Sequence, residues 1–184
     1  MEAFFASTLT VAIAEIGDKT QLLALLLAVR FNNKTAIIMG ILLSTLVNHF
    51  LAAWIGQWAV SRIDPQWATY LVSGSFFAIA LWVLIPDKID GGDNRFYILG
   101  AFAATFVLFF VAEIGDKTQI ATIVLAAKYD SLMWVVFGTT LGMLIANVPV
   151  VILGQLSAER LPMVLIHRSC AALFVLLGLA TLLW

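Results

Sequence analysis

Charged residues are scarce in this 184-residue chain, where Asp, Glu, Lys and Arg together make up 11% of the sequence. A soluble domain carries about 25% charged and about 45–50% apolar residues. Because 62% of this chain is hydrophobic, the composition excludes an ordinary soluble globular protein and predicts an integral membrane protein. The formal net charge of −1 leaves no basic surface, so we expect no nucleic-acid partner.

Cysteine is almost absent, since Cys170 is the single one. One thiol excludes an intrachain disulfide and a thiolate metal cluster. The sequence also lacks a nucleotide-binding motif and a soluble domain to hold one, which leaves ion gradients as the evident energy source. We therefore expect no tightly bound cofactor and no enzymatic activity.

Long apolar runs dominate what is present. Six segments reach the length of about 20 residues that a helix needs to cross a bilayer, namely 3–29, 35–60, 66–86, 96–127, 131–157 and 163–184. Short polar stretches separate them. The sequence thus predicts an all-α polytopic membrane protein of six transmembrane helices.

The octapeptide AEIGDKTQ occurs twice, at 14–21 and at 112–119, with an offset of 98 residues. Gly40 and Gly138 keep the same offset. We therefore expect two homologous three-helix repeats, residues 1–90 and 91–184, within one integrated membrane domain. An odd number of spans inverts the second repeat, and transporters built from inverted repeats bind substrate near the midplane where the repeats meet.

The basic residues of the loops predict the orientation in the membrane. Arg62 and Lys128 lie on one side. The six on the other side are Arg30, Lys34, Lys88, Arg95, Arg160 and Arg168. Because cytoplasmic loops are richer in Lys and Arg, both termini are predicted to lie outside the cytoplasm, in a protein of the cell inner membrane.

Charged side chains lie in the middle of the apolar runs. Glu15 is about 18 Å into the first span at 1.5 Å per residue, near the centre of a hydrocarbon core about 30 Å thick, and Glu113 has a comparable depth. Residues three and four apart on a helix share a face, so Glu15 and Asp18 are expected to point the same way, as are Glu113 and Asp116. Lys19 can then reach Glu15, and Lys117 can reach Glu113. The glycine between the two acids of each motif lets another helix approach closely or lets the backbone open locally.

A structural interpretation treats these charges as Glu–Lys ion pairs that hold the bundle together. It leaves Asp18 and Asp116 without obvious partners, and apolar packing usually stabilises as well as a buried ion pair. In a functional interpretation, four carboxylates against two lysines leave two negative charges, which one divalent cation neutralises. Oxygen ligands suit Mg, Ca and Mn. Without the metal, neighbouring carboxylates repel one another and take up protons, so metal and protons compete for one site.

Two copies of Glu-x-Gly-Asp-Lys-Thr in a small six-helix inverted repeat resemble the uncharacterised protein family 0016, the Gdt1 family of cation/proton exchangers. Its bacterial members resemble manganese exporters, and its eukaryotic members move Ca and Mn into the Golgi. The resemblance covers nearly the whole chain and implies Glu15, Asp18, Glu113 and Asp116 as the metal and proton site. The same resemblance implies that the remaining motif residues support the metal site, namely Lys19, Thr20, Lys117 and Thr118.

Amide and imidazole side chains lie near these acids. Asn48 and His49 are in the middle of the second span, and Asn147 corresponds to His49 in the fifth. They either form hydrogen bonds between helices or flank the metal, where an imidazole shifts selectivity from Ca toward a transition metal. Gln21 and Gln119 either ligate the metal and line its path, or pack and cap the helices.

The sequence as a whole predicts a secondary transporter that exports a divalent cation, Mn²⁺ first and Ca²⁺ second, in exchange for protons. Its partners are then the metal ion, protons and the lipid bilayer, and a homo-oligomer remains open. One alternative is a small-solute exporter of the amino-acid type, with an apolar cavity beside the acids. The other is a non-transporting membrane assembly partner.

Overall fold

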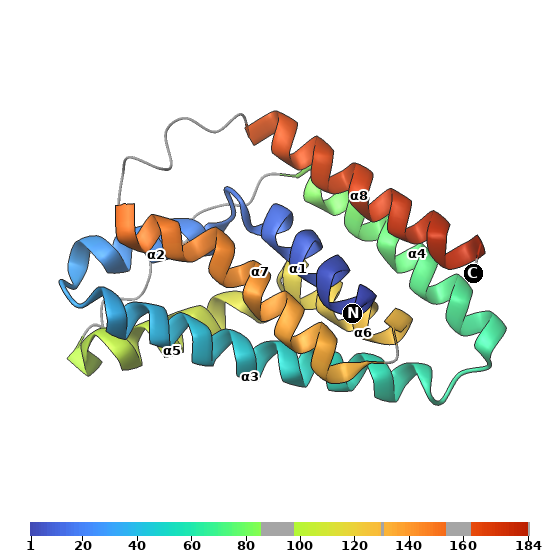
Figure 1. The fold of residues 1–184 in the computed structure, drawn as a ribbon, viewed down its shortest axis with the longest axis horizontal. Helices are drawn as coiled ribbons and strands as arrows, with labels where there is room; N and C mark the ends of the chain where they lie inside the picture. The colour runs from blue at the N-terminus through green and yellow to red at the C-terminus, as the bar shows by residue number, and fades with distance from the viewer. Residues whose placement is uncertain (86–97, 130, 154–162, 184) are drawn as a thin grey trace.

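The computed structural model describes residues 1–85, 98–129, 131–153 and 163–183, and these residues form eight α-helices and no β-strand (Figure 1). The all-α class predicted from the sequence is therefore confirmed for this part of the chain. The helices are α1 (Glu2–Glu15), α2 (Lys19–Arg30), α3 (Lys34–Val60), α4 (Pro65–Val83), α5 (Gly100–Glu113), α6 (Lys117–Tyr129), α7 (Leu132–Leu153) and α8 (Met163–Leu183).

Two of the predicted spans are not continuous helices. The apolar segment 3–29 contains α1 and α2, and the segment 96–127 contains α5 and α6. Each half is 12 to 14 residues long, or about 18–21 Å at 1.5 Å per residue. A half-helix is therefore too short to cross a hydrocarbon core of about 30 Å alone.

Three helices of the described chain, α3, α4 and α7, are long and apolar enough to cross a membrane by themselves. The outer surface of the molecule suits lipid, since large apolar side chains such as Trp54, Trp67 and Trp134 are exposed. The interior is polar by comparison. Its buried polar side chains include Ser44, Thr45, Asn48, His49, Thr139 and Asn147. This distribution is expected for a membrane protein, where polar groups turn toward the bundle interior.

The two halves of the chain have corresponding helices. α1 and α5 are both 14 residues long and begin 98 residues apart, and the starts of α3 and α7 and of α4 and α8 differ by the same offset. The packing corresponds as well, because α1 packs against α7 and α5 packs against α3. The repeat boundary at 90/91 lies outside the described residues, as do Lys88, Arg95 and Arg160 from the orientation argument.

Corresponding glycines allow these helices to touch. A Cβ atom added to Gly40 of α3 would lie 2.7 Å from the Thr105 Cβ of α5. A Cβ atom added to Gly138 of α7 would lie 2.5 Å from the Phe4 carbonyl oxygen of α1. Both distances are too short for any side chain, so the absence of a Cβ atom sets how closely these helix pairs pack.

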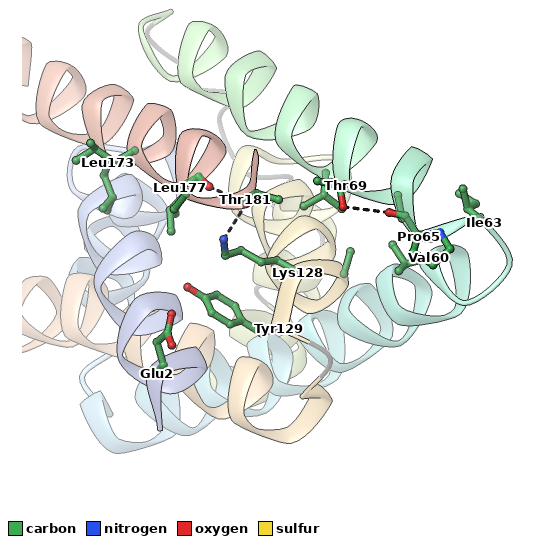
Figure 2. A pocket seen from close by; sticks show the side chains of 15 residues that line it. Glu2, Val60, Ile63, Pro65, Thr69, Lys128, Tyr129, Leu173, Leu177 and Thr181 are labelled. Atoms are coloured by element: carbon green, nitrogen blue, oxygen red, sulfur yellow. Dashed lines mark hydrogen bonds between the residues drawn. The ribbon is translucent and has the colours of Figure 1, made fainter. Parts of the chain in front are cut away.

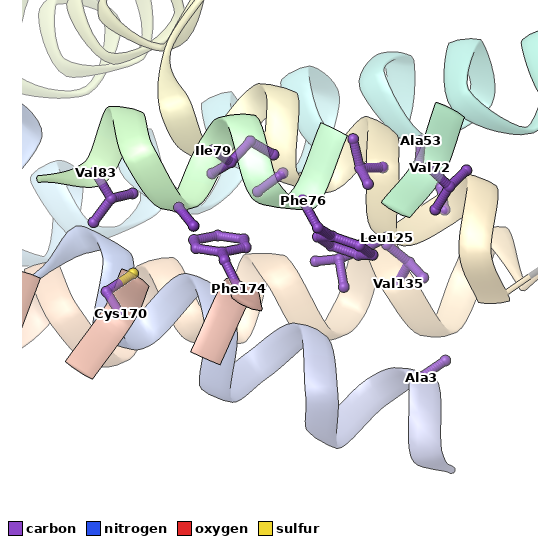
Figure 3. Close-up of a cluster of buried hydrophobic side chains, with 14 of the residues drawn as sticks. Ala3, Ala53, Val72, Phe76, Ile79, Val83, Leu125, Val135, Cys170 and Phe174 are labelled. Atoms are coloured by element: carbon purple, nitrogen blue, oxygen red, sulfur yellow. The ribbon is translucent and has the colours of Figure 1, made fainter. Parts of the chain in front are cut away.

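The last helix of each half lies on the flank of the bundle, where α4 and α8 run side by side (Figure 1). Their interface is apolar, with Phe76 and Phe174 at a ring-centroid distance of 6.3 Å and Cys170 buried in the same cluster (Figure 3). The Ser73 hydroxyl donates to the Gly178 carbonyl across it at 2.9 Å. The motifs belong to α1, α2, α5 and α6, and these helices together with α3 and α7 hold the candidate site.

Replacing Gly138 with Ala is expected to destabilise the protein by about 1–3 kcal/mol, because the new Cβ atom collides with backbone rather than with a flexible side chain. Gly74→Ala is the matched control, since a Cβ atom there meets nothing within 4 Å. Alanine is the better helix former by about 1 kcal/mol, so the control should be neutral or stabilising. Thermal unfolding in detergent compares the two, and equal melting temperatures would contradict the packing argument.

Candidate metal centre

Both motif copies interrupt a helix at the same point. α1 ends at Glu15 and α5 at Glu113, and in each case the second residue beyond is a glycine in the left-handed region. The φ angle is 81° at Gly17 and 75° at Gly115. A Cβ atom at Gly115 would meet nothing within 4 Å. Of the two roles predicted for the motif glycine, the structure thus supports local opening of the backbone at Gly115 rather than close approach of a helix.

The expectation that Glu15 and Asp18 share one helical face is wrong for this reason. Glu15 is the last residue of α1, whereas Asp18 is the N-cap of α2, with extended backbone at φ −79° and ψ 169°. The i to i+3 spacing places side chains on one face only where the helix is continuous. The break therefore separates Asp18 from the helical face of Glu15, whereas in the second motif Glu113 and Asp116 still meet at the Thr118 hydroxyl.

The motif lysines also have partners that a continuous helix does not predict. Lys19 Nζ forms an ion pair with Asp116 Oδ1 at 2.8 Å, so the lysine of the first motif reaches the second motif rather than Glu15. Lys117 Nζ donates to the Ile85 carbonyl at 2.8 Å, just beyond the end of α4. A main-chain carbonyl of this kind has no side-chain signal in the sequence, and Ile85 was accordingly missed.

Three of the four predicted acids converge. Glu15, Glu113 and Asp116 each offer a carboxylate oxygen within 4.8 Å of the others. Their exposed fractions are 0%, 0% and 2%. Asp18 is also buried but is not a member of this cluster. The cluster thus combines one acid from the first motif with both acids from the second.

The motif threonines hold one oxygen of each glutamate. The Thr20 hydroxyl donates to Glu15 Oε2, and the Thr118 hydroxyl donates to Glu113 Oε2 at 2.9 Å and to Asp116 Oδ2 at 3.3 Å. The other oxygens, Oε1 of both glutamates, have no hydrogen-bond partner among the described residues. Buried polar atoms nearly always have a partner, so these oxygens are suited to bind a cation or a proton.

The motif glutamines stabilise the helix breaks. Gln21 Oε1 accepts a hydrogen bond from the Gly17 amide at 2.8 Å, and Gln119 Oε1 accepts one from the Gly115 amide at 2.7 Å. Gln119 also donates through Nε2 to Asn48 Oδ1 of α3. Of the alternatives left open for the glutamines, these contacts match helix capping and packing.

The amides on α3 and α7 adjoin the cluster from both halves. Asn147 Nδ2 lies 3.4 Å from Glu15 Oε2. Asn48 Nδ2 donates to a carbonyl of α5 at 3.3 Å, as expected for a hydrogen bond between helices. His49 Nε2 lies 3.9 Å from Glu113 Oε2. Met143 is a neighbour that no sequence pattern singles out, and its Sδ lies 3.3 Å from Asn147 Nδ2.

The chemistry of the cluster matches a hard divalent cation. Ca²⁺ and Mg²⁺ bind oxygen at about 2.0–2.6 Å, so two ligands of one ion lie at most about 5 Å apart. The separations within the cluster meet that limit. When all three carboxylates are ionised, the Lys19 ammonium leaves two negative charges, which one divalent ion neutralises.

A cavity of about 690 Å³ lies elsewhere, among α4, α8 and the ends of α1, α3 and α6 (Figure 2). Its polar lining includes Glu2, Lys128 and Tyr129, and Lys128 Nζ donates to the Thr181 hydroxyl at 2.8 Å. None of the motif residues lines it. This cavity is therefore separate from the carboxylate cluster.

Comparisons with known proteins agree with the geometry. A sequence model of the family described as "Divalent cation/proton antiporter GDT1" matches residues 3–91 and 101–184. A protein of Vibrio cholerae serotype O1 named "Putative manganese exporter" is 53% identical over 182 residues, which cover 98% of this chain and 90% of that protein.

More distant relatives occur in plants. "GDT1-like protein 5" of Arabidopsis thaliana is 25% identical over 221 residues, which cover 100% of this chain and 96% of that protein. "Protein PAM71-homolog, chloroplastic" of the same plant is 28% identical over 212 residues, which cover 97% of this chain and 58% of that protein. No solved structure matches the chain.

Substituting Gly115 tests whether the helix break needs the left-handed backbone. Gly115→Ala should cost about 1–2 kcal/mol of stability, because an L-residue with a Cβ atom is strained at this φ angle. Gly115→Asn is the matched control and should cost less, since Asn adopts the left-handed region more readily. Melting temperatures in detergent provide the measurement. An Asn variant less stable than the Ala variant would contradict backbone strain as the cause.

Proposed function

The chain belongs to the GDT1 family of divalent cation/proton antiporters, and on that premise we propose that it exports Mn²⁺ from the cytoplasm in exchange for protons. Ca²⁺ is the second candidate substrate. One observation supports this proposal above the others: carboxylates from both motif copies converge in the buried interior, at the separation that a single metal ion requires.

The cluster couples metal to protons through electrostatics. Carboxylates this close repel one another when they are ionised and alone, and either a divalent cation or protons remove that repulsion. Binding of one therefore displaces the other. Protons that enter from outside release the metal there, and loss of those protons to the cytoplasm restores the site for the next ion.

The proposed architecture is six spans in two inverted repeats, residues 1–90 and 91–184. α1 with α2 forms one span, and α5 with α6 forms another, each broken at its motif. Discontinuous helices at the interface of inverted repeats are where many secondary transporters bind their ions. The equal offsets of the corresponding helices support this arrangement. We place the protein in the inner membrane with both termini outside the cytoplasm.

The two motifs are identical in sequence but differ in position, and this difference suggests how access alternates. Asp116 belongs to the cluster and pairs with Lys19, whereas Asp18 lies outside the cluster. In the proposed cycle the repeats exchange these roles, so Asp18 becomes a ligand when the site faces the other side. All four predicted acids then take part, although three converge in the state described.

The rival functions receive less support. An exporter of amino acids calls for an apolar cavity beside the acids. Neither the cavity of about 690 Å³ nor a smaller apolar one of about 330 Å³ on α3 and α7 is lined by any of them. An assembly partner does not need oxygens from both repeats to meet at metal-binding separations. A transported metal ion accounts for both observations.

Removing the charge of either glutamate tests the proposed exchange of Mn²⁺ for protons. Glu15→Gln and Glu113→Gln should each lower Mn²⁺-dependent proton flux in proteoliposomes by about a hundredfold or more, since removing a metal ligand costs at least as much as removing a residue that supports one. Glu2→Gln is the matched control, because Glu2 is an exposed glutamate of α1 and belongs to neither motif. Unchanged flux in both motif variants would refute the proposed mechanism.

The two aspartates test the exchange of roles. Asp116→Asn should weaken Mn²⁺ binding to the protein at rest, whereas Asp18→Asn should leave that binding nearly unchanged, because only Asp116 is in the cluster. Both variants should nevertheless slow turnover, since each aspartate serves one half of the cycle. Equilibrium binding and flux are measured on the same preparations. An Asp18→Asn variant with normal turnover would exclude the role given to Asp18.

A further inference from the structure

His49 of α3 is a buried side chain whose surroundings do not explain it. Its exposed fraction is 0%, and neither Nδ1 nor Nε2 has a hydrogen-bond partner in the part of the chain that the structure describes. Buried imidazoles ordinarily bond to a carbonyl, a carboxylate or a water. The interhelical hydrogen bond that the sequence left open for this residue is therefore not formed.

The nearest charged group is a member of the carboxylate cluster. His49 Nε2 lies 3.9 Å from Glu113 Oε2, which is too long for a hydrogen bond. It is nevertheless within the separation of about 5 Å that two ligands of one ion allow. The nitrogen is thus at ligand distance from Glu113, one acid of the cluster, while His49 itself lies outside the group of three acids whose oxygens are within 4.8 Å of one another.

The neighbouring amides do have partners. Asn48 accepts from Gln119 and donates to α5, and Asn147 donates toward Glu15. Asn147 is the residue that corresponds to His49 at the offset of 98. The repeat therefore offers an amide beside one glutamate and an unbonded imidazole beside the other.

Resting on the proposed function, we propose that His49 is a nitrogen ligand of the transported cation and sets its preference for Mn²⁺ over Ca²⁺ and Mg²⁺. Carboxylates alone discriminate weakly among these ions, because all three accept oxygen ligands. An imidazole suits transition metals and adds nothing to the binding of Ca²⁺ or Mg²⁺. As a neutral ligand it also leaves unchanged the two negative charges that the cation neutralises.

Selectivity is the property to measure, since a purely structural histidine would affect all metals alike. The half-saturating metal concentrations are measured in proteoliposomes of the full chain. The His49→Gln variant keeps a polar side chain but replaces the imidazole ring, and with it the nitrogen ligand, by a side-chain amide. Half-saturating Mn²⁺ should rise about tenfold, less than for a glutamate variant, because His49→Gln leaves all three carboxylates of the cluster in place. Half-saturating Ca²⁺ should hardly change. Ser44→Ala is the matched control on α3, a buried hydroxyl without a partner in the described residues, and should leave the Mn²⁺ to Ca²⁺ ratio unaltered.

Electron spin-echo spectroscopy of bound Mn²⁺ reports the ligand directly. The parent chain should show coupling of the metal to an imidazole ¹⁴N nucleus, and His49→Gln should lose it. If that variant does not fold, His49→Asn is used instead, since Asn is the residue at the corresponding position 147 of the other repeat. It should lose the ¹⁴N coupling in the same way. Absence of ¹⁴N coupling in the parent, or an equal effect of the variant on Mn²⁺ and Ca²⁺, would overturn the role of His49. Absence of metal-dependent proton flux in the parent would instead refute the proposed function itself.

Discussion

A carboxylate buried in an apolar interior is stable only when hydrogen bonds, an opposite charge or protons compensate for the water it has lost. This requirement organises the centre of the molecule. The hydroxyls of Thr20 and Thr118 each donate to a glutamate, and the Lys19 ammonium meets Asp116. This compensation is incomplete, because one oxygen of each glutamate has no hydrogen-bond partner among the described residues. In the proposed mechanism, a cation or a proton completes it.

The helix breaks make these contacts possible. On a continuous helix, Lys19 and Glu15 would be four residues apart and would share one face. Their charges would then neutralise each other and leave little affinity for a metal. Interrupting the helix at Gly17 and Gly115 turns the first residues of α2 and α6 toward the acids instead. The motif then supplies donors to its own glutamate through threonine and a cation to the other repeat through Lys19.

The sequence predicted the all-α class, which the described residues confirm, and it pointed to the four acids because buried charge in an apolar run is conspicuous. Three of those acids converge. The sequence did not show the breaks, since each motif is a short polar stretch inside an apolar segment whose total length suits one continuous span. The glycine was the one local signal, and it allowed two explanations. The ion pair of Lys19 with Asp116 was equally hidden, because it depends on how two distant segments meet.

Identical motifs cannot by themselves explain the differences between the two halves of the site. AEIGDKTQ reads the same at 14–21 and 112–119, yet Asp116 joins the cluster and Asp18 does not. The difference must arise from conformation or from the surrounding helices, and those helices differ: α3 offers Asn48 and His49 where α7 offers Ala146 and Asn147. In the proposed mechanism the motif therefore provides charge and exchange with protons, which any hard divalent ion can use. Discrimination among such ions has to come from the unequal residues around it.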